Sequence, residues 1–175
     1  ANKKYEITDN GTSIESYGAL AGVSETLDHV TPHYTLSTQI NSSHIIANCY
    51  HVELGTVPNY LMKSKPYKYN QFDWTQDILR LPTTPTAITA FRGRIYVFDE
   101  NNTYKIEPNN LFIEDTFEGV GCSGSRALTV TEYGMFFCNK QNIWVHDGNR
   151  PSPIGNAILK NYDSDSTHGW QENTL

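Results

Sequence analysis

The chain has 175 residues, 38% of them hydrophobic, which suits a single globular domain. Only 18% are charged, against an average of about 25%, and the chain is instead rich in Tyr, Thr and Asn. Its net charge of −6 argues against a nucleic-acid-binding face, for which a basic stripe is expected.

The N-terminal part has the weakest periodicity. Residues 5–8 are predicted to form a strand, but Gly18 and Gly22 lie in a small, polar stretch that disfavours a stable helix. Residues 1–42 are therefore predicted to be an extended arm or an irregular segment.

Propeller-like β blades are predicted over residues 43–160. Apolar runs at 45–52 and 60–64 predict two strands of a divergent blade, separated by Gly55 and Pro58. Residues 65–74 are expected to be a polar and aromatic connection, and 81–85 a loop. Residues 161–175 are predicted to be a polar tail or the start of a next segment.

The strongest signal is an internal repeat. Residues 87–90 and 96–99 resemble residues 127–130 and 136–139, an offset of 40 (127 − 87) that also aligns Tyr104 with Trp144. In both copies, short apolar runs alternate with turn residues, as in a propeller blade of about 40 residues. We predict that 87–107 and 127–147 form two antiparallel meanders, with Tyr104 and Trp144 in equivalent buried positions. The fold class is all-β, with propeller-like four-stranded antiparallel meanders and a repeat of about 40 residues, which at this length gives an incomplete propeller.

Several short patterns resemble functional motifs. The segment Gly119 to Gly124 fits GxGxxG, but a strand-like stretch follows it where a dinucleotide site needs a helix, so we interpret it as an inter-blade connection. Cys122 is a weak candidate nucleophile, and the carboxylates supply no pair that sequence alone identifies as catalytic. The three cysteines (Cys49, Cys122 and Cys138) form no CxxC pair. We predict no catalytic residue, no cofactor, no metal site and no enzymatic activity.

The succession of apolar strands and small loops resembles a known family. It comprises residues 45–48, 62–64 with Phe72, 88–91 with 95–98, 121–123 with Ser125 and Leu128, 143–148 and 153–154. This pattern, over roughly residues 40–160, is similar to the bacteriophage tail-hub proteins, the propeller-bearing neck, nozzle and tail-tube-closing proteins of short-tailed phages.

The resemblance implies a virion structural protein of the phage tail, made in the host cytoplasm and without enzymatic activity. Its implied partners are copies of itself, in a ring around the DNA exit channel, and other tail or neck proteins. Members of that family have a complete propeller with appended domains, so this chain is expected to be part of a longer protein or to be completed by neighbours. DNA would pass through without specific binding, and no apolar run is long enough to predict a membrane span.

The alternative is a carbohydrate-binding β module, lectin-like or associated with a glycoside hydrolase. Its candidate sugar platform is formed by Tyr67, Tyr69, Phe72 and Trp74. The same rings would otherwise be wedged between strands or against a partner subunit, where aromatic residues are common.

Overall fold

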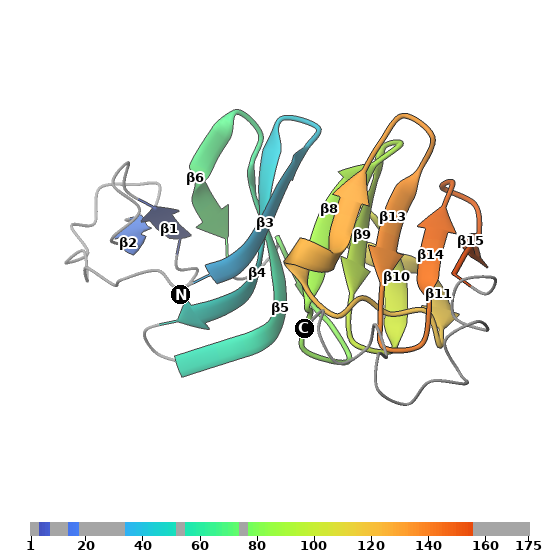
Figure 1. The fold of residues 1–175 in the computed structure, drawn as a ribbon. Helices are drawn as coiled ribbons and strands as arrows, with labels where there is room; N and C mark the ends of the chain where they lie inside the picture. Colours follow the sequence, from blue (N-terminus) through green and yellow to red (C-terminus); the bar gives the residue numbers. More distant parts are fainter. Residues whose placement is uncertain (1–3, 8–13, 18–33, 52–54, 74–76, 156–175) are drawn as a thin grey trace.

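The computed structural model describes residues 4–7, 14–17, 34–51, 55–73 and 77–155. These residues are almost entirely strands and turns, with a single 3-10 turn at Ser125–Ala127. The predicted all-β fold of propeller-like antiparallel meanders is therefore confirmed (Figure 1). The strands are β1 Lys4–Ile7, β2 Ile14–Tyr17, β3 Tyr34–Ile40, β4 Ser43–His51, β5 Gly55–Lys65, β6 Lys68–Asp73, β7 Ile78–Arg80, β8 Ala87–Phe91, β9 Arg94–Phe98, β10 Asn102–Glu107, β11 Phe112–Glu118, β12 Leu128–Val130, β13 Met135–Cys138, β14 Ile143–His146 and β15 Pro151–Pro153.

The two copies of the repeat form two four-stranded antiparallel sheets, β8 to β11 and β12 to β15, each in sequential order. Val97 pairs with Tyr104 in the first sheet, and Phe137 pairs with Trp144 in the second, so the offset of 40 extends to the strand register. The offset of 40 residues does not extend to the fourth strand of each sheet. His146 pairs with Pro151 directly before its turn, whereas Ile106 pairs with Ile113 and is followed by one more pair, Glu107 with Phe112, before a turn of the same length.

The N-terminal sheet differs from the sequence prediction. Strand β3, which lies within the predicted arm, pairs with β4, so the boundary expected at residue 42 falls inside a hairpin. Its side chains alternate between exposed and buried, and only Leu36 is fully buried, which explains the weak apolar signal. The expected connection at 65–74 contains strand β6, and β1 and β2 extend the sheet beyond it. The expected tail at 161–175 lies outside the described residues.

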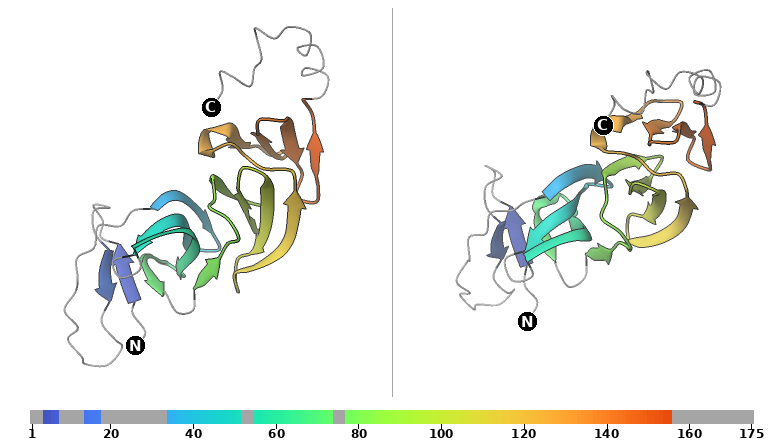
Figure 2. Two further views of the ribbon diagram at one scale, coloured as in Figure 1. Left: turned by 90° about the horizontal axis from the view of Figure 1, so that it is seen from below. Right: turned by 60° about the horizontal axis from the view of Figure 1, so that its bottom comes forward.

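The three sheets follow one another as a stack (Figure 2). Strand β9 lies in the middle sheet and is buried on both faces. Ile95 and Val97 pack against Leu36, Ile45 and Leu61 of the first sheet. Tyr96 and Phe98 point the other way and join a core cluster with Met135 and Phe137 of the third sheet. Burial of both faces makes this strand apolar at successive positions instead of alternate ones.

The prediction for the large aromatic pair is confirmed in one copy and wrong in the other. Tyr104 is 4% exposed, but Trp144, at the equivalent register position, is only partly buried. The hydroxyl of Tyr104 donates to the Asp99 carboxylate at 2.8 Å, whereas the Trp144 indole makes a longer contact of 3.4 Å to Asn139. The polar groups around the two rings therefore differ, although the backbone pairing is the same.

His146 is a fully buried titratable group between the second and third sheets. Its ring makes T-shaped contacts with Tyr96 at 5.0 Å and Phe117 at 4.9 Å. The backbone N–H of Gly148 donates to Nδ1, so the neutral ring carries its proton on Nε2. Burial lowers the pKa of His146 to about 4.

We expect the free energy of unfolding to decrease as the pH falls from 6.5 to about 4, by roughly 3 kcal/mol. In this range the unfolded chain binds a proton at His146 that the folded chain excludes. Denaturant unfolding at a series of pH values measures the slope, and His146→Leu should flatten it within this window. An unchanged slope in the variant would contradict the assignment.

Candidate functional site

The four aromatic residues predicted from the sequence do not form a platform. Tyr67 lies in the turn between β5 and β6 and is 79% exposed, and Tyr69 is 45% exposed. Phe72 is buried against Ile46 and Met62 in the core of the first sheet, so it is unavailable to a sugar. Trp74 lies outside the described residues.

Two equivalent turns form the most distinctive polar feature of the structure. The Asp99 carboxylate, through Oδ1, accepts hydrogen bonds from the backbone N–H groups of Asn101 and Asn102 at 2.6 and 2.5 Å. Forty residues later, Asn139 Oδ1 accepts from the backbone N–H groups of Gln141 and Asn142 at 3.0 and 2.9 Å. These side chains close the β9–β10 and β13–β14 turns in the same way.

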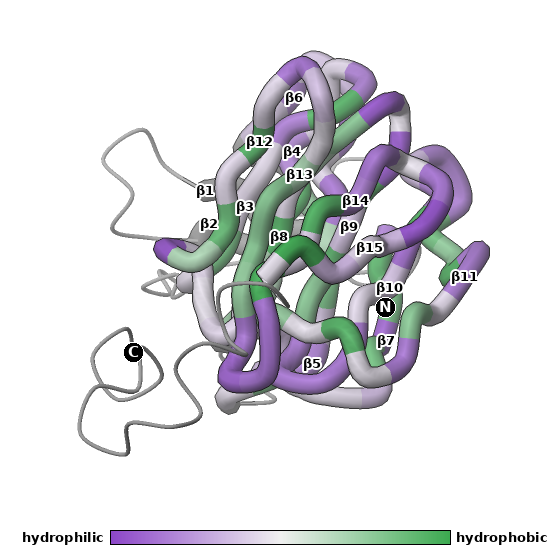
Figure 3. Tube along the Cα trace, turned by 45° about the vertical axis from the view of Figure 1, so that its right-hand side comes forward, coloured by the Kyte–Doolittle hydropathy of each residue, from purple (hydrophilic) through white to green (hydrophobic). Residues whose placement is uncertain are grey.

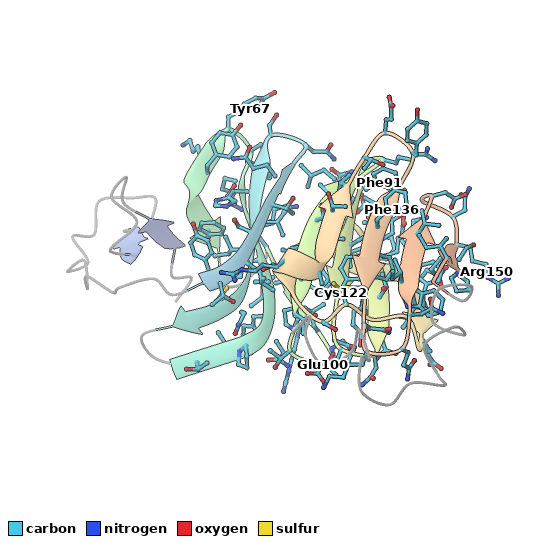
Figure 4. All side chains as sticks on the ribbon, in the orientation of Figure 1. Tyr67, Phe91, Glu100, Cys122, Phe136 and Arg150 are labelled. Atoms are coloured by element: carbon cyan, nitrogen blue, oxygen red, sulfur yellow. The ribbon has the colours of Figure 1, made fainter. Side chains whose placement is uncertain are left out.

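A cleft of about 350 Å³ lies between these two turns. It is lined by Glu100, Asn101, Ser123, Asn139, Lys140 and Gln141. Figure 4 shows Glu100 at the end of the molecule opposite Tyr67, so the cleft and the exposed tyrosine are at different ends.

The glycine-rich connection between the second and third sheets supports this cleft. A Cβ atom on Gly121 would lie 2.3 Å from the carbonyl carbon of Glu100, so the connection contacts the first turn backbone to backbone. The backbone N–H of Cys122 donates to the Asp99 carbonyl at 2.9 Å, and that of Ser123 donates to the Cys138 carbonyl at 3.0 Å. The GxGxxG segment is thus an inter-blade connection that ties the two turns together, as predicted.

Behind the first turn, the Asp99 carboxylate is almost fully buried and saturated with donors. Its Oδ2 atom accepts from the hydroxyl groups of Thr83 at 2.5 Å and Tyr104 at 2.8 Å, and from the side-chain amide of Asn102 at 3.1 Å. Burial raises the pKa of Asp99, but these hydrogen bonds together outweigh it and hold the pKa below its usual value. Asp99 is therefore an ionised structural group, unsuited to proton transfer at neutral pH.

The second turn has different chemistry at the matching positions. At the offset of 40, Thr83, Asp99 and Tyr104 correspond to Ser123, Asn139 and Trp144. Asn139 is 7% exposed, and its Nδ2 makes no hydrogen bond within the described part of the chain. The polar network that closes around Asp99 in the first copy is thus not repeated around Asn139 in the second.

Comparison with known proteins leaves the family unassigned. No family model matches the chain, and no curated protein matches its sequence. Among solved structures, the crystal structure of Myxococcus xanthus glutaminyl cyclase is similar, with a TM-score of 0.48 and 7% sequence identity over 94% of this chain and 71% of that chain. At this level of similarity, neither the fold nor the activity of that protein is transferred.

The described groups offer limited catalytic chemistry. Burial raises the pKa of the Cys122 thiol to about 11, so this candidate nucleophile is protonated at neutral pH. Glu100 is the one carboxylate among the residues that line the cleft, whereas glycoside hydrolysis needs a facing pair. Within the described ranges, no group of three or more His, Cys, Asp or Glu side chains is placed to hold a metal ion, and no helix has the length and apolar character to cross a membrane.

We expect Gly121→Ala to destabilise the protein by about 1–3 kcal/mol, because the added methyl group would overlap the backbone of Glu100. Gly124→Ala is the matched control, since no atom lies within 4 Å of its Cβ position and its φ of 166° is extended. Thermal or denaturant unfolding of both variants makes the comparison. Equal stability of the two variants would show that the close approach at Gly121 is wrong.

Asp99→Asn gives the first turn the chemistry of the second. At pH 7 it should lower the free energy of unfolding by about 1–3 kcal/mol, because an amide nitrogen cannot accept from Thr83 and Tyr104. The depressed pKa of Asp99 stabilises the native protein above the ordinary carboxyl pKa, and this stabilisation is lost as the pH falls through the native value. The variant should lack that loss in acid unfolding experiments, whereas Glu100→Gln, at an exposed position of the same turn, should retain it.

Proposed function

We propose that this chain is a structural protein of a bacteriophage tail or neck, which contributes to a ring around the DNA exit channel and has no enzymatic activity. The observation that carries the proposal is an apolar sheet face that is partly exposed at the end of the stack. Strands β13 and β14 contribute Phe136, Cys138, Ile143 and Val145 to this face. Figure 3 shows the hydrophobic stretches along these strands.

The repeat indicates what such a face requires. Phe136 and Cys138 correspond to Tyr96 and Phe98, which are 1% and 0% exposed because the next sheet packs on them. In the third sheet the equivalent side chains are only half-buried, and no further described sheet covers them. An exposed apolar face of this kind is typical of a surface that meets another protein element. Assembly with neighbouring sheets or subunits would bury it.

The charge distribution supports DNA passage without retention. Proteins that hold DNA cluster Lys and Arg against phosphates and lose affinity steeply with salt. Here the net charge is −6, and several of the cations are paired with carboxylates. Lys65 lies 2.5 Å from Asp77, and Arg94 lies 2.7 Å from Glu114. A surface of this kind is expected to bind a phosphate backbone weakly.

The assembly proposal predicts that the full-length protein is oligomeric by light scattering and that Phe136→Asp lowers its mass towards the monomer. Phe112→Asp is the control, because Phe112 is 48% exposed on the outer strand of the middle sheet. Circular dichroism of both variants shows whether the fold is retained.

A gel-shift assay with duplex DNA at about 50 mM salt tests the channel role, since non-specific phosphate binding is strong under that condition. We expect no retained complex. A monomer that binds duplex DNA tightly would contradict both parts of the proposal.

A further inference from the structure

The core between the second and third sheets contains an unpaired polar atom. Among the residues that the structure describes, the buried side-chain nitrogen or oxygen atom without a hydrogen-bond partner is Nε2 of His146. Because the backbone N–H of Gly148 donates to Nδ1 at 2.9 Å, the neutral ring carries its proton on Nε2. A buried donor without a partner costs free energy in the folded state and calls for a physical explanation.

The β14–β15 turn, which follows His146, is tied to the second sheet by hydrogen bonds. The Gly148 carbonyl accepts from the Tyr96 hydroxyl at 3.0 Å and from the Lys105 ammonium group at 3.3 Å. The carbonyl of the preceding residue, Asp147, accepts from the guanidinium group of Arg92. The turn therefore contacts strands β9 and β10 and the β8–β9 turn at the same time.

Protonation of His146 is incompatible with this arrangement. An imidazolium ring donates from both nitrogens, so its Nδ1–H would face the backbone N–H of Gly148, which is also a donor. The ring is 0% exposed, and a positive charge at this position would be removed from water. The charged ring can regain water and a suitable partner only if the turn moves away from the second sheet.

The groups around the ring do not offset this penalty. The titratable and charged side chains of the elements packed near it are Tyr96, Lys105, Asp115, Asp147 and Arg92, together with the Arg94–Glu114 ion pair beside Tyr96. Burial is the largest effect on the pKa of His146 and lowers it to about 4, although Asp147 and Asp115 favour the charged form and Lys105 opposes it. Burial raises the pKa of Tyr96, so its hydroxyl stays neutral in acid.

The turn can open locally because strand β15 is weakly attached to β14. Pro151 and Pro153 have no backbone N–H, so neither can donate to the neighbouring strand. Ser152 is the one residue of β15 with a backbone donor. The buried residues of the first sheet belong to other clusters, which opening of this turn leaves intact. Local opening of a weakly held segment requires less free energy than global unfolding.

We propose that His146 is an acid-sensitive switch for the β14–β15 turn, and that its protonation releases this turn from the second sheet while the first sheet stays folded. The unpaired Nε2–H and the single acceptor at Nδ1 make the closed turn dependent on a neutral ring. Release brings the ring of His146 and the hydroxyl of Tyr96 into contact with water. This inference does not depend on the proposed assembly role.

The test is amide hydrogen exchange of the ¹⁵N-labelled chain, followed by NMR from pH 7 to pH 3.5 and corrected for the intrinsic exchange rate at each pH. The reporter is the amide of Gly148, which is bonded to His146. Its protection should fall about tenfold per pH unit between pH 6.5 and about 4, because the open state binds a proton that the closed state excludes. The amide of Ile46, in the central strand β4, should remain more protected at every pH.

Three variants separate the switch from general acid instability. His146→Gln has a side-chain oxygen that can accept from Gly148 but does not titrate, so the pH dependence at Gly148 should disappear. Tyr96→Phe lacks the donor to the Gly148 carbonyl, so it should lower the protection of Gly148 at every pH and keep the tenfold slope. His44→Gln is the matched control, because His44 also has a pKa lowered by burial but lies in the first sheet, and it should behave as the wild type does.

Each of three results would overturn the proposal. The first is protection of Gly148 that stays constant between pH 6.5 and pH 4. The second is protection of Gly148 equal to that of Ile46 at every pH, which would show that the turn opens only by global unfolding. The third is a pH dependence that persists in His146→Gln. None of these results concerns the oligomeric state, so failure of the switch and failure of the assembly proposal are distinguishable.

Discussion

Face-to-face packing of neighbouring sheets is the interaction on which the structure depends. Strand β9 has the first sheet on one side and the third on the other, and residues 95–98 are almost completely buried. Phe98 meets Phe137 with ring centroids 4.8 Å apart, so the interface has the close aromatic packing of a core. A single meander has no such protection, because one face and both edge strands remain open. Each sheet therefore depends on packing against its neighbour for stability, and the last described sheet has such a neighbour on one face only.

The repeat could be predicted from sequence because turn chemistry and strand length recur together. The Asp99 and Asn139 turns are separated by the same interval as the apolar runs that flank them, so two independent signals fix the register. Strands β3 and β6 escaped prediction for physical reasons. In β3 only alternate residues face the core, and Ser, Thr and Gln occupy the remaining positions. Strand β6 contains the exposed Tyr69 and the buried Phe72. Its sequence was therefore interpreted as a polar and aromatic connection and not as a strand.

The cleft was not predicted, because no motif marks it and its lining residues come from three segments that only the fold brings together. Sequence comparison within the repeat emphasises what is shared, namely the turn acceptor at positions 99 and 139. The informative change is the loss of a carboxylate oxygen where the first copy binds Thr83 and Tyr104. Aligning the copies and asking where a polar residue changes its hydrogen-bonding character would have identified Asn139. The burial of Asn139 and the close approach of Gly121 to the backbone of Glu100 could be found only from the three-dimensional structure.

The two turns also show that one backbone arrangement accommodates two different side-chain acceptors. A carboxylate at position 99 accepts every donor around it, which leaves a filled, ionised and rigid joint between the first and second sheets. An amide at position 139 has only one acceptor atom, which accepts from the turn and from the Trp144 indole, and its nitrogen can only donate. The two turns thus keep the same backbone hydrogen bonds and strand pairing while the second side-chain atom changes from an acceptor to a donor. The packing that stabilises the sheets involves different side chains from those that line the cleft, so the polar groups of the turns can differ between copies while the core between the sheets is kept.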